Sequence, residues 1–322
     1  MLPIAARESS GQRVLVAGSL AFDQIMTFPG YFKDHILPDK IHMINLSFLV
    51  DDFRKQRGGC AGNIAYTMAL LGERPTAVAT AGNDFDEYRE WLDAEGVETG
   101  EIRIHDDEVT ASCFITTDKA DNQITGFFVG AMARAREISL AEVAARGGAA
   151  YAVVAPDDPG AMARHCREAK RAGLPLVFDP SFQVIAMDGD TLREAADGAY
   201  AVILNDYEFA VLQEKTGLSE KALRKLAELW VVTYGEKGSD VLRASGERIP
   251  VPACPVTEVV DPTGAGDAFR GGFVTGLLRG VELPVCGRMG AVAAAYAIER
   301  YGTQNHRYTR DEFWARYEQA FG

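Results

Sequence analysis

Two kinds of hydrophobic pattern alternate along this chain. Short runs rich in valine, isoleucine and leucine are apolar at nearly every position, whereas longer segments repeat apolar residues every three or four positions. The short runs predict buried strands at residues 14–18, 76–80, 150–155, 176–179, 201–205, 229–234 and 241–243. The longer segments predict helices at residues 60–71, 86–94, 159–172, 191–196, 207–216, 219–226, 265–279 and 283–300. This alternation predicts an α/β fold, in which helices cover both faces of a mostly parallel sheet and ligands bind beyond the carboxyl ends of the strands.

Two segments depart from the alternation. Residues 22–57 contain turn signals and an apolar patch, and residues 109–130 read as two strands, 110–117 and 123–129, joined by a polar turn at 118–122. Together they predict a small sheet that projects from the main layer. The pattern leaves open the alternative that they are extra edge strands of the larger sheet.

Charge and composition exclude several classes of protein. The chain has 322 residues, 47% of them hydrophobic, and a net charge of −13, so it can bury a large core but offers no basic surface for nucleic acid. Its five cysteines are scattered and include no Cys-x-x-Cys pair, which predicts reduced thiols rather than disulfides or a zinc site. No apolar run approaches the ~20 residues of a membrane span, and the N-terminus lacks a signal-peptide pattern. We therefore expect a soluble, cytoplasmic protein that binds neither nucleic acid nor membrane.

The most informative motif is Asp-Pro-Thr-Gly-Ala-Gly-Asp-Ala-Phe-Arg-Gly-Gly at residues 261–272. A small turn, Gly264-Ala265-Gly266, leads into a helical pattern, and the unpaired amides at a helix start attract an anion. Asp267 lies in the first helical turn, next to whatever anion these amides hold. A carboxylate beside a phosphate is the arrangement that a small-molecule kinase needs. Taken as Gly-x-Gly-Asp alone, the pattern is also that of an ordinary helix N-terminus.

The complete motif resembles the signature of the ribokinase-like (PfkB) family of carbohydrate and nucleoside kinases. The resemblance implies a ribokinase-like α/β fold with a small β-sheet lid over the substrate. It implies that the amides of Gly264, Ala265 and Gly266 form an anion hole and that Asp267 is the general base. The core would then comprise residues 1–21, 58–108 and 131–322, and the lid residues 22–57 and 109–130.

Two further motifs fall where the family binds its sugar. The run Gly-Gly-Cys-Ala-Gly-Asn at residues 58–63 opens a predicted helix, and Asp23 follows the first predicted strand. Glycine allows a ligand close to the backbone, an asparagine amide both donates and accepts, and a carboxylate can accept from two vicinal hydroxyls. The resemblance implies that Gly59, Asn63 and Asp23 bind the substrate. Taken alone, glycines before a helix more often form only a turn, and an aspartate after a strand is typical of a solvated loop.

Motifs for the nucleotide follow later strands. Asn205 and Glu208 have the spacing of a helix capping box, and the same Asn-x-x-Glu pattern resembles the family motif that organises Mg²⁺ and its waters. Thr233, Gly235 and Gly238 resemble the family turn beneath the nucleotide triphosphate, although the run also reads as a strand followed by a turn. Residues 297–305 align with the adenine pocket of the family. No Walker-type or dinucleotide glycine motif occurs, and the histidines show no metal-binding spacing.

The same helix carries Arg270, one turn beyond Asp267. From that position its side chain is predicted to reach the γ-phosphate of bound ATP. A lone exposed arginine on the helix is the alternative.

The resemblance extends over nearly the whole chain to the prokaryotic nucleoside (adenosine) kinase branch of the family. A nucleoside needs an apolar slot and an amide for its base, which Phe48, Phe127 and Gln123 could provide, although all three suit the lid's own core equally well. One departure from that branch is the sequence at 181–185, so base preference or rate could differ.

We therefore expect ATP- and Mg²⁺-dependent phosphorylation of the 5′-hydroxyl of a ribonucleoside, with adenosine as the first candidate. The alternatives are a hexose or ribose kinase of the same family and a non-catalytic nucleotide-binding protein. Base preference, phosphoryl donor and monovalent-cation dependence stay open. So does the choice between a monomer and a homodimer, because lids in this family can pair between subunits.

Overall fold

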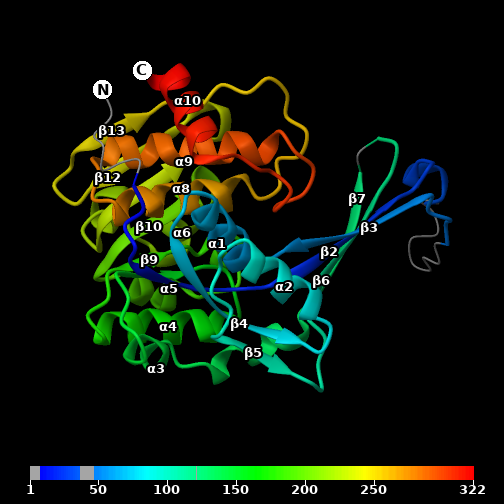
Figure 1. Ribbon diagram of the computed structural model, residues 1–322, viewed down its shortest axis with the longest axis horizontal. Helices are drawn as coiled ribbons and strands as arrows, with labels where there is room; N and C mark the ends of the chain where they lie inside the picture. Colours follow the sequence, from blue (N-terminus) through cyan, green and yellow to red (C-terminus); the bar gives the residue numbers. More distant parts are fainter. Residues whose placement is uncertain (1–7, 37–46, 121) are drawn as a thin grey trace.

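The computed structural model describes residues 8–36, 47–120 and 122–322, and its main body is built on one large sheet (Figure 1). The strands lie in the order β13-β12-β11-β10-β9-β8-β1-β4-β5, and all neighbours are parallel except the pairs formed by β12. In chain order these strands are β1 Arg13–Ala17, β4 Arg74–Gly82, β5 Ile102–His105, β8 Tyr151–Val154, β9 Leu176–Phe178, β10 Ala199–Asn205, β11 Ala227–Thr233, β12 Ser239–Arg243 and β13 Arg248–Val251. The predicted α/β class is confirmed.

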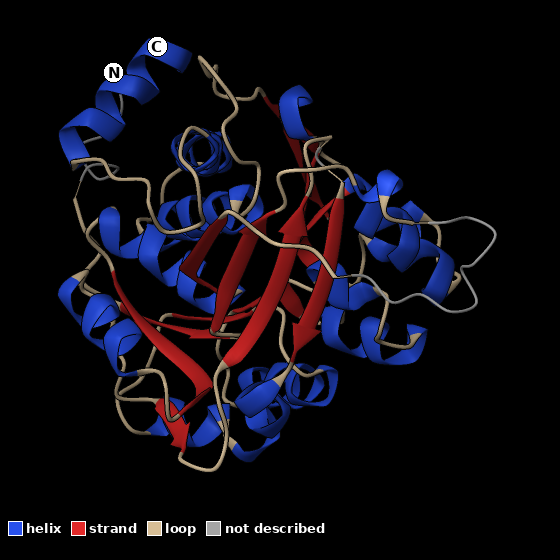
Figure 2. Ribbon diagram, turned by 90° about the vertical axis from the view of Figure 1, so that its right-hand side faces the viewer, coloured by secondary structure: helices blue, strands red, loops and turns tan. Residues whose placement is uncertain are grey.

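The sheet is apolar on both faces because helices cover each of them (Figure 2). In β1, Val14 and Val16 point into a core shared with α1, α2, α8 and α9, whereas Leu15 and Ala17 point into a second core shared with α3 to α7. Helix α10 packs on α9 around a third apolar cluster. The helices are α1 Cys60–Leu70, α2 Asp86–Ala94, α3 Leu140–Ala145, α4 Pro159–Arg171, α5 Gly189–Ala196, α6 Asp206–Thr216, α7 Glu220–Leu223, α8 Ala265–Leu278, α9 Leu283–Ile298 and α10 Arg310–Phe321.

A second sheet projects from this body, on the right of Figure 1. Its strands are β2 Ala21–Thr27, β3 Asp52–Gly58, β6 Ala111–Thr117 and β7 Gln123–Phe128, in the order β3-β2-β6-β7. The pair β2–β6 is parallel and the other two pairs are antiparallel. The predicted small projecting sheet, including the β6–β7 hairpin, is confirmed, and the alternative of extra edge strands is wrong. We call this sheet the lid sheet.

Asp118 shapes the turn of the lid hairpin. Its carboxylate accepts hydrogen bonds from the amides of Ala120 and Asn122, at 2.8 and 2.9 Å, and from the amide of Phe32 at 2.9 Å. These bonds outweigh desolvation and lower the pKa of Asp118 to about 2. The turn therefore keeps a negative charge that binds backbone donors from both segments of the lid. Part of the predicted apolar patch before β3, residues 41–46, lies outside the described residues.

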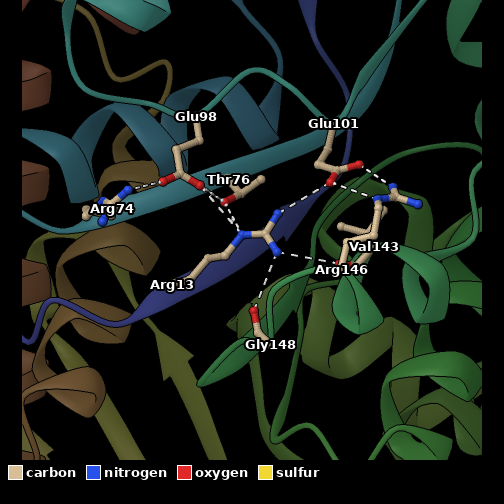
Figure 3. Close-up of polar contacts among 8 residues, drawn as sticks. All are labelled: Arg13, Arg74, Thr76, Glu98, Glu101, Val143, Arg146 and Gly148. Carbon is tan, nitrogen blue, oxygen red and sulfur yellow. Dashed lines mark hydrogen bonds and ion pairs between the residues drawn. The ribbon is translucent and has the colours of Figure 1, made fainter.

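The amino ends of the central strands are held by a polar cluster (Figure 3). Arg13 opens β1 and donates to Thr76 Oγ1 of β4 at 2.9 Å, and it lies 3.6 Å from Glu98 and 3.5 Å from Glu101. Arg74 opens β4 and pairs with Glu98 at 2.7 Å. Charged side chains thus cross-link this edge of the sheet, and the carboxyl ends of the same strands are left for the site.

Candidate functional site

The N-terminus of α8 forms an anion-binding turn. Gly264 precedes the helix with φ +78°, a conformation that favours glycine, and a side chain there would lie 2.9 Å from Thr303. The amide of Ala265 donates to the carbonyl of Pro262 at 3.3 Å. Among the described residues, no acceptor is bonded to the amides of Gly264, Gly266 or Asp267. The free donors are therefore these three amides, whereas that of Ala265, part of the predicted anion hole, is used inside the turn.

The carboxylate of Asp267 is buried at the head of α8 and held from a second helix. Asn63 of α1 donates through Nδ2 to Asp267 Oδ2 at 2.8 Å. Burial raises the pKa of Asp267, and the charge of Arg270 and the hydrogen bonds from Asn63 and Cys60 lower it again. A buried carboxylate with a raised pKa is a stronger proton acceptor than an exposed one, which suits a general base.

Arg270 is turned into the protein. Its side chain is 8% exposed, and its Nε lies 2.6 Å from Asp179 Oδ2, with Glu208 at 3.8 Å from Nη2. A Cβ at Gly266 would lie 2.5 Å from Arg270 Nη1, so the guanidinium passes directly behind the anion-binding turn. The alternative of a lone exposed arginine is wrong. Direct contact with a phosphate stays a prediction, since the structure shows Arg270 as a buried positive charge behind the free amides.

Asp179 follows β9 and was not among the predicted site residues. It is fully buried, and burial raises its pKa to about 7 although Arg270 opposes the shift. The sequence signal for it was a carboxylate at the end of a buried strand. Asp179 belongs to the site because it forms an ion pair with Arg270. The two residues are far apart along the chain, so the sequence alone did not indicate this pair.

The lid sheet brings Asp23 to the opposite side of the site. Asp23 lies on β2, paired with Gln56 of β3 and Cys113 of β6. Burial and the nearby charges of Asp261 and Asp267 raise its pKa to about 7. Among the described residues no donor is bonded to its carboxylate. An acceptor held without a protein donor is what a hydroxylated substrate would satisfy.

Gly59 connects the lid sheet to α1. Its φ is +89°, and a Cβ there would lie 2.6 Å from Leu20 Cα and from the Ser19 carbonyl oxygen. Glycine is therefore required so that β3 can turn directly into α1. This turn places Asn63 within reach of Asp267.

Asn205 and Glu208 form the capping box that their spacing predicts. Asn205 Oδ1 accepts from the Glu208 amide and Glu208 Oε2 accepts from the Asn205 amide, both at 2.8 Å. The other oxygen of Glu208 has only a long contact, 3.5 Å, with Ser181 Oγ. One carboxylate oxygen is thus open to a water in the shell of Mg²⁺, which prefers oxygen ligands and keeps several waters. Among the described residues no cluster of three or more His, Cys, Asp or Glu side chains could hold a metal directly.

A cavity of about 610 Å³ adjoins the anion-binding turn. Thr233, Gly235, Gly238 and Gly266 line it, so residues predicted for the nucleotide and for the anion hole border one space. Its remaining wall is largely apolar and includes Val259, Phe269, Ala291, Ala294, Ala295 and Ile298. The predicted adenine stretch 297–305 contributes only Ile298, because the wall is formed by α9 itself and the loop after it turns toward the lid.

The three residues predicted for the base slot lie in the lid. The ring of Phe48 packs on Phe28 and Phe32, with centroids 4.7 and 5.4 Å apart. Gln123 and Phe127 are exposed on β7, where Gln123 Nε2 donates to Thr117 Oγ1 at 3.3 Å. These residues have a fixed place in the lid sheet, and their contact with a base stays a prediction.

The cysteines and the hydrophobic helices can also be compared with the sequence-based expectations. All five cysteines are free thiols. Within the described ranges, no helix has the length and apolar character needed to cross a bilayer.

Comparison with known proteins identifies the class to which this site belongs. Residues 23–310 match the pfkB family of carbohydrate kinases, and the chain belongs to this family. It is a phosphotransferase that uses a hydroxyl group as acceptor.

Individual relatives narrow the comparison. A nucleoside kinase of Methanothermobacter thermautotrophicus is 34% identical over 304 residues, which cover 92% of this chain and 93% of the relative. The structure of Burkholderia thailandensis nucleoside kinase in complex with inosine is 39% identical, covers 96% of this chain and 98% of that one, and superposes with a TM-score of 0.86. The Methanocaldococcus jannaschii nucleoside kinase, 26% identical, covers the same shares with a TM-score of 0.86. The ribokinase-like fold with a projecting lid sheet is therefore confirmed.

Proposed function

We propose that this protein is a nucleoside kinase, which transfers the γ-phosphoryl group of ATP to the 5′-hydroxyl of a ribonucleoside. One observation carries the proposal: the carboxylate of Asp267, the free amides of Gly264 and Gly266 and the large apolar cavity that Gly266 lines all lie at the N-terminal end of α8, near enough to Asp23 of the lid for the charge of Asp267 to raise the pKa of Asp23. The similarity to nucleoside kinases over more than nine-tenths of the chain supports a nucleoside rather than a free sugar.

Each group has a role in the transfer. The 5′-oxygen attacks the γ-phosphorus, the bond from that phosphorus to the ADP oxygen breaks, and the hydroxyl proton passes to Asp267. Negative charge on the transferring group is stabilised by the free amides and by Arg270 behind them. Adenine would occupy the apolar wall beside Ala294, and Thr233 and the glycines of that turn would border the phosphates.

Magnesium fits this site through water. Asn205 and Glu208 would hold Mg²⁺ by way of its water shell, where the ion would neutralise phosphate charge. Both side chains are already oriented by the capping box, so they need no rearrangement. Dependence on a monovalent cation stays open.

The acceptor is held from the lid side. The carboxylate of Asp23 can accept from the 2′- and 3′-hydroxyls of a ribose, and Asn63 retains one amide hydrogen beyond the one given to Asp267. Closure of the lid sheet over the ribose would exclude water, which otherwise competes for the phosphoryl group. We propose adenosine as the first substrate to test, with Gln123, Phe48 and Phe127 as candidate contacts of the base.

The experiment is a measurement of ADP release by purified protein with ATP and Mg²⁺. Adenosine, inosine, guanosine and cytidine are compared with ribose, fructose and fructose 6-phosphate. The proposal expects turnover with at least one nucleoside and none with the free sugars. Turnover with sugars alone would refute the nucleoside assignment, and silence on all seven would also contradict it and would point to an acceptor outside this set.

Quaternary structure and location are further proposals. The lid sheet ends at β7, whose residues are all exposed and whose outer edge pairs with no other strand in the described parts of the chain. Such an edge can pair with a second copy, so sedimentation velocity should distinguish a homodimer from a monomer. A cytoplasmic location and the lack of a nucleic-acid partner stay predictions.

A further inference from the structure

A buried glutamine lies behind the site, in the loop that follows α9. Gln304 is 2% exposed, and its Nε2 donates to Asn63 Oδ1 at 2.9 Å and to the hydroxyl of Tyr88. Asn63 in turn donates to Asp267, and Tyr88 donates to the carbonyl of Gly58 at 2.8 Å. One side chain therefore branches toward the proposed base and toward the junction of the lid sheet with α1.

The loop that carries Gln304 is fixed from several sides. The amide of Gly302 donates to Asp261 Oδ2 at 2.9 Å, which attaches the loop to the segment before the anion-binding turn. Thr303 Oγ1 donates to the carbonyl of Arg57 in β3 at 2.9 Å, which attaches it to the lid sheet. The loop of Gln304 is thus held by the segment before the anion-binding turn and by β3 of the lid sheet.

Each amide side chain in this chain of hydrogen bonds has one donor end and one acceptor end, so the orientation of one amide fixes that of the next. An ionised carboxylate only accepts, so Asn63 must turn its amide nitrogen toward Asp267 and its oxygen away. That oxygen needs a donor, and the amide nitrogen of Gln304 supplies it. If Gln304 were replaced by an acceptor, Asn63 would gain by flipping, and its oxygen would then face the carboxylate of Asp267.

We propose that Gln304 is a positioning residue, which fixes the amide orientation of Asn63 and through it the direction in which the Asp267 carboxylate faces the substrate hydroxyl. The inference rests on the proposed role of Asp267 as the base. Asn63 donates to Asp267 Oδ2 at 2.8 Å, and the thiol of Cys60 also hydrogen-bonds to this carboxylate, so the orientation of Asn63 helps to fix which carboxylate oxygen is left for the substrate.

Two costs indicate that Gln304 is more than a filler of the core. Its Oε1 is buried and has no partner among the described residues, although an unpaired buried acceptor costs about 1–3 kcal/mol. Gly62 lies inside α1, where glycine is about 1 kcal/mol worse than alanine, and a Cβ there would overlap Tyr88 Oη and would lie 3.0 Å from both Gln304 Nε2 and Leu20 Cδ2. An apolar side chain at position 304 would avoid the first cost. Alanine at position 62 would avoid the second, if the side chains packed there left room for its Cβ. The first cost arises at the oxygen of Gln304, and the second arises where Tyr88, Gln304 and Leu20 pack against α1.

The test compares substitutions that keep the volume of Gln304 but change its polarity. Gln304→Met removes the donor, and Gln304→Glu replaces it with an acceptor in nearly the same shape. We expect Gln304→Met to lower kcat about 10- to 100-fold, as a misplaced catalytic group does, with the KM for ATP unchanged within twofold. Gln304→Glu should lower kcat at least as much, because it favours the flipped Asn63. Because it keeps the shape, it also serves as the second variant if Gln304→Met does not fold.

Tyr88→Phe is the matched control, because it removes the other partner of Gln304 and leaves the branch to Asp267 intact. We expect its kcat within about threefold of the wild type, even if its melting temperature falls as far as that of Gln304→Met. The decisive background is Asn63→Ala, in which Gln304→Met should have no further effect on kcat if Gln304 acts through Asn63.

Two results would overturn the inference: a kcat for Gln304→Met within twofold of the wild type, or an equal loss in the Asn63→Ala background. Asp267→Asn separates these failures from a failure of the proposed function. If Asp267→Asn is inactive while Gln304→Met is not, the base stands and only the positioning role is wrong. If Asp267→Asn keeps its activity, the base assignment is wrong and the positioning role with it.

Discussion

The ionisation of Asp23 should control nucleoside binding near neutral pH. Its pKa is raised to about 7, chiefly by burial and further by the charges of Asp261 and Asp267. The ionised carboxylate can accept from one hydroxyl on each oxygen, whereas protonation removes the charge and turns one oxygen into a donor, so we expect the ionised form to bind the ribose diol. Binding should therefore strengthen as pH rises through 7.

The magnitude follows from that pKa. A group with a pKa of about 7 is roughly one-tenth ionised at pH 6, one-half at pH 7 and nine-tenths at pH 8. Since apparent affinity scales with the binding-competent fraction, Kd should fall about tenfold between pH 6 and pH 8. The folded-state pKa lies above the unfolded value of 3.8, so the stability linked to this group is present below about pH 4 and is lost as pH rises through 7. The ligand-free Asp23→Asn variant should accordingly melt at a higher temperature than the wild type at pH 8.

Titration calorimetry with 5′-deoxyadenosine isolates this effect, because the ligand has no 5′-hydroxyl for Asp267 to deprotonate. The Kd of the wild type should show this tenfold change, and binding at pH 6 should release close to one proton. Asp23→Asn should bind about tenfold more weakly at pH 8, as expected for the loss of a charged acceptor. Its affinity should be the same at both pH values. A wild-type Kd that is flat from pH 6 to 8, or an equal slope in Asp23→Asn, would refute the reasoning.

Two other predictions concern stability and the nucleotide. Arg279 and Glu73 form an ion pair at 2.8 Å with side chains 1% and 0% exposed, so Arg279→Met alone should lower the free energy of unfolding by about 3–5 kcal/mol in urea titration. The double variant Arg279→Met/Glu73→Met should regain part of the lost free energy of unfolding. A double variant that is less stable than Arg279→Met alone would contradict the account. Ala294→Phe should fill the apolar wall of the cavity and raise the KM for ATP more than tenfold while the Kd for the nucleoside stays within twofold. An unchanged KM for ATP would place adenine elsewhere.

Much of the fold could be predicted because a parallel sheet buried on both faces leaves nearly continuous apolar runs in its strands. In the large sheet, β5 and β13 were missed, and each has only four residues and carries a charged side chain. In the lid sheet, the region of β2 and β3 was predicted but not the two strands themselves. Helix α10 was missed although Thr309 and Glu312 form a capping box at its start. The sequence therefore contained a helix-start signal. The aromatic residues that follow it pack on α9 rather than on the sheet, so this helix lies outside the alternation of strands and helices on which the prediction was based.

The site could be predicted where backbone geometry constrains the sequence. Gly59 and Gly264 adopt positive φ values that few other residues tolerate, so they mark the turns on either side of Asp267. Arg270 and Gln304 left no comparable signal. The direction of Arg270 depends on Asp179, and that of Gln304 on Asn63, 241 residues away in the chain. Only the folded chain brings these partners together.

The most direct test of the central claim is single-turnover phosphorylation of adenosine by Asp267→Asn, with Asp190→Asn as the matched control. Asp190 undergoes the same chemical change on a side chain that is 90% exposed. The account predicts a loss of about 10²–10⁴-fold or more in the rate of 5′-phosphate formation for Asp267→Asn, with nucleoside affinity within threefold and a control rate equal to that of the wild type. A rate for Asp267→Asn within tenfold of the wild type would contradict the assignment of Asp267 as the base.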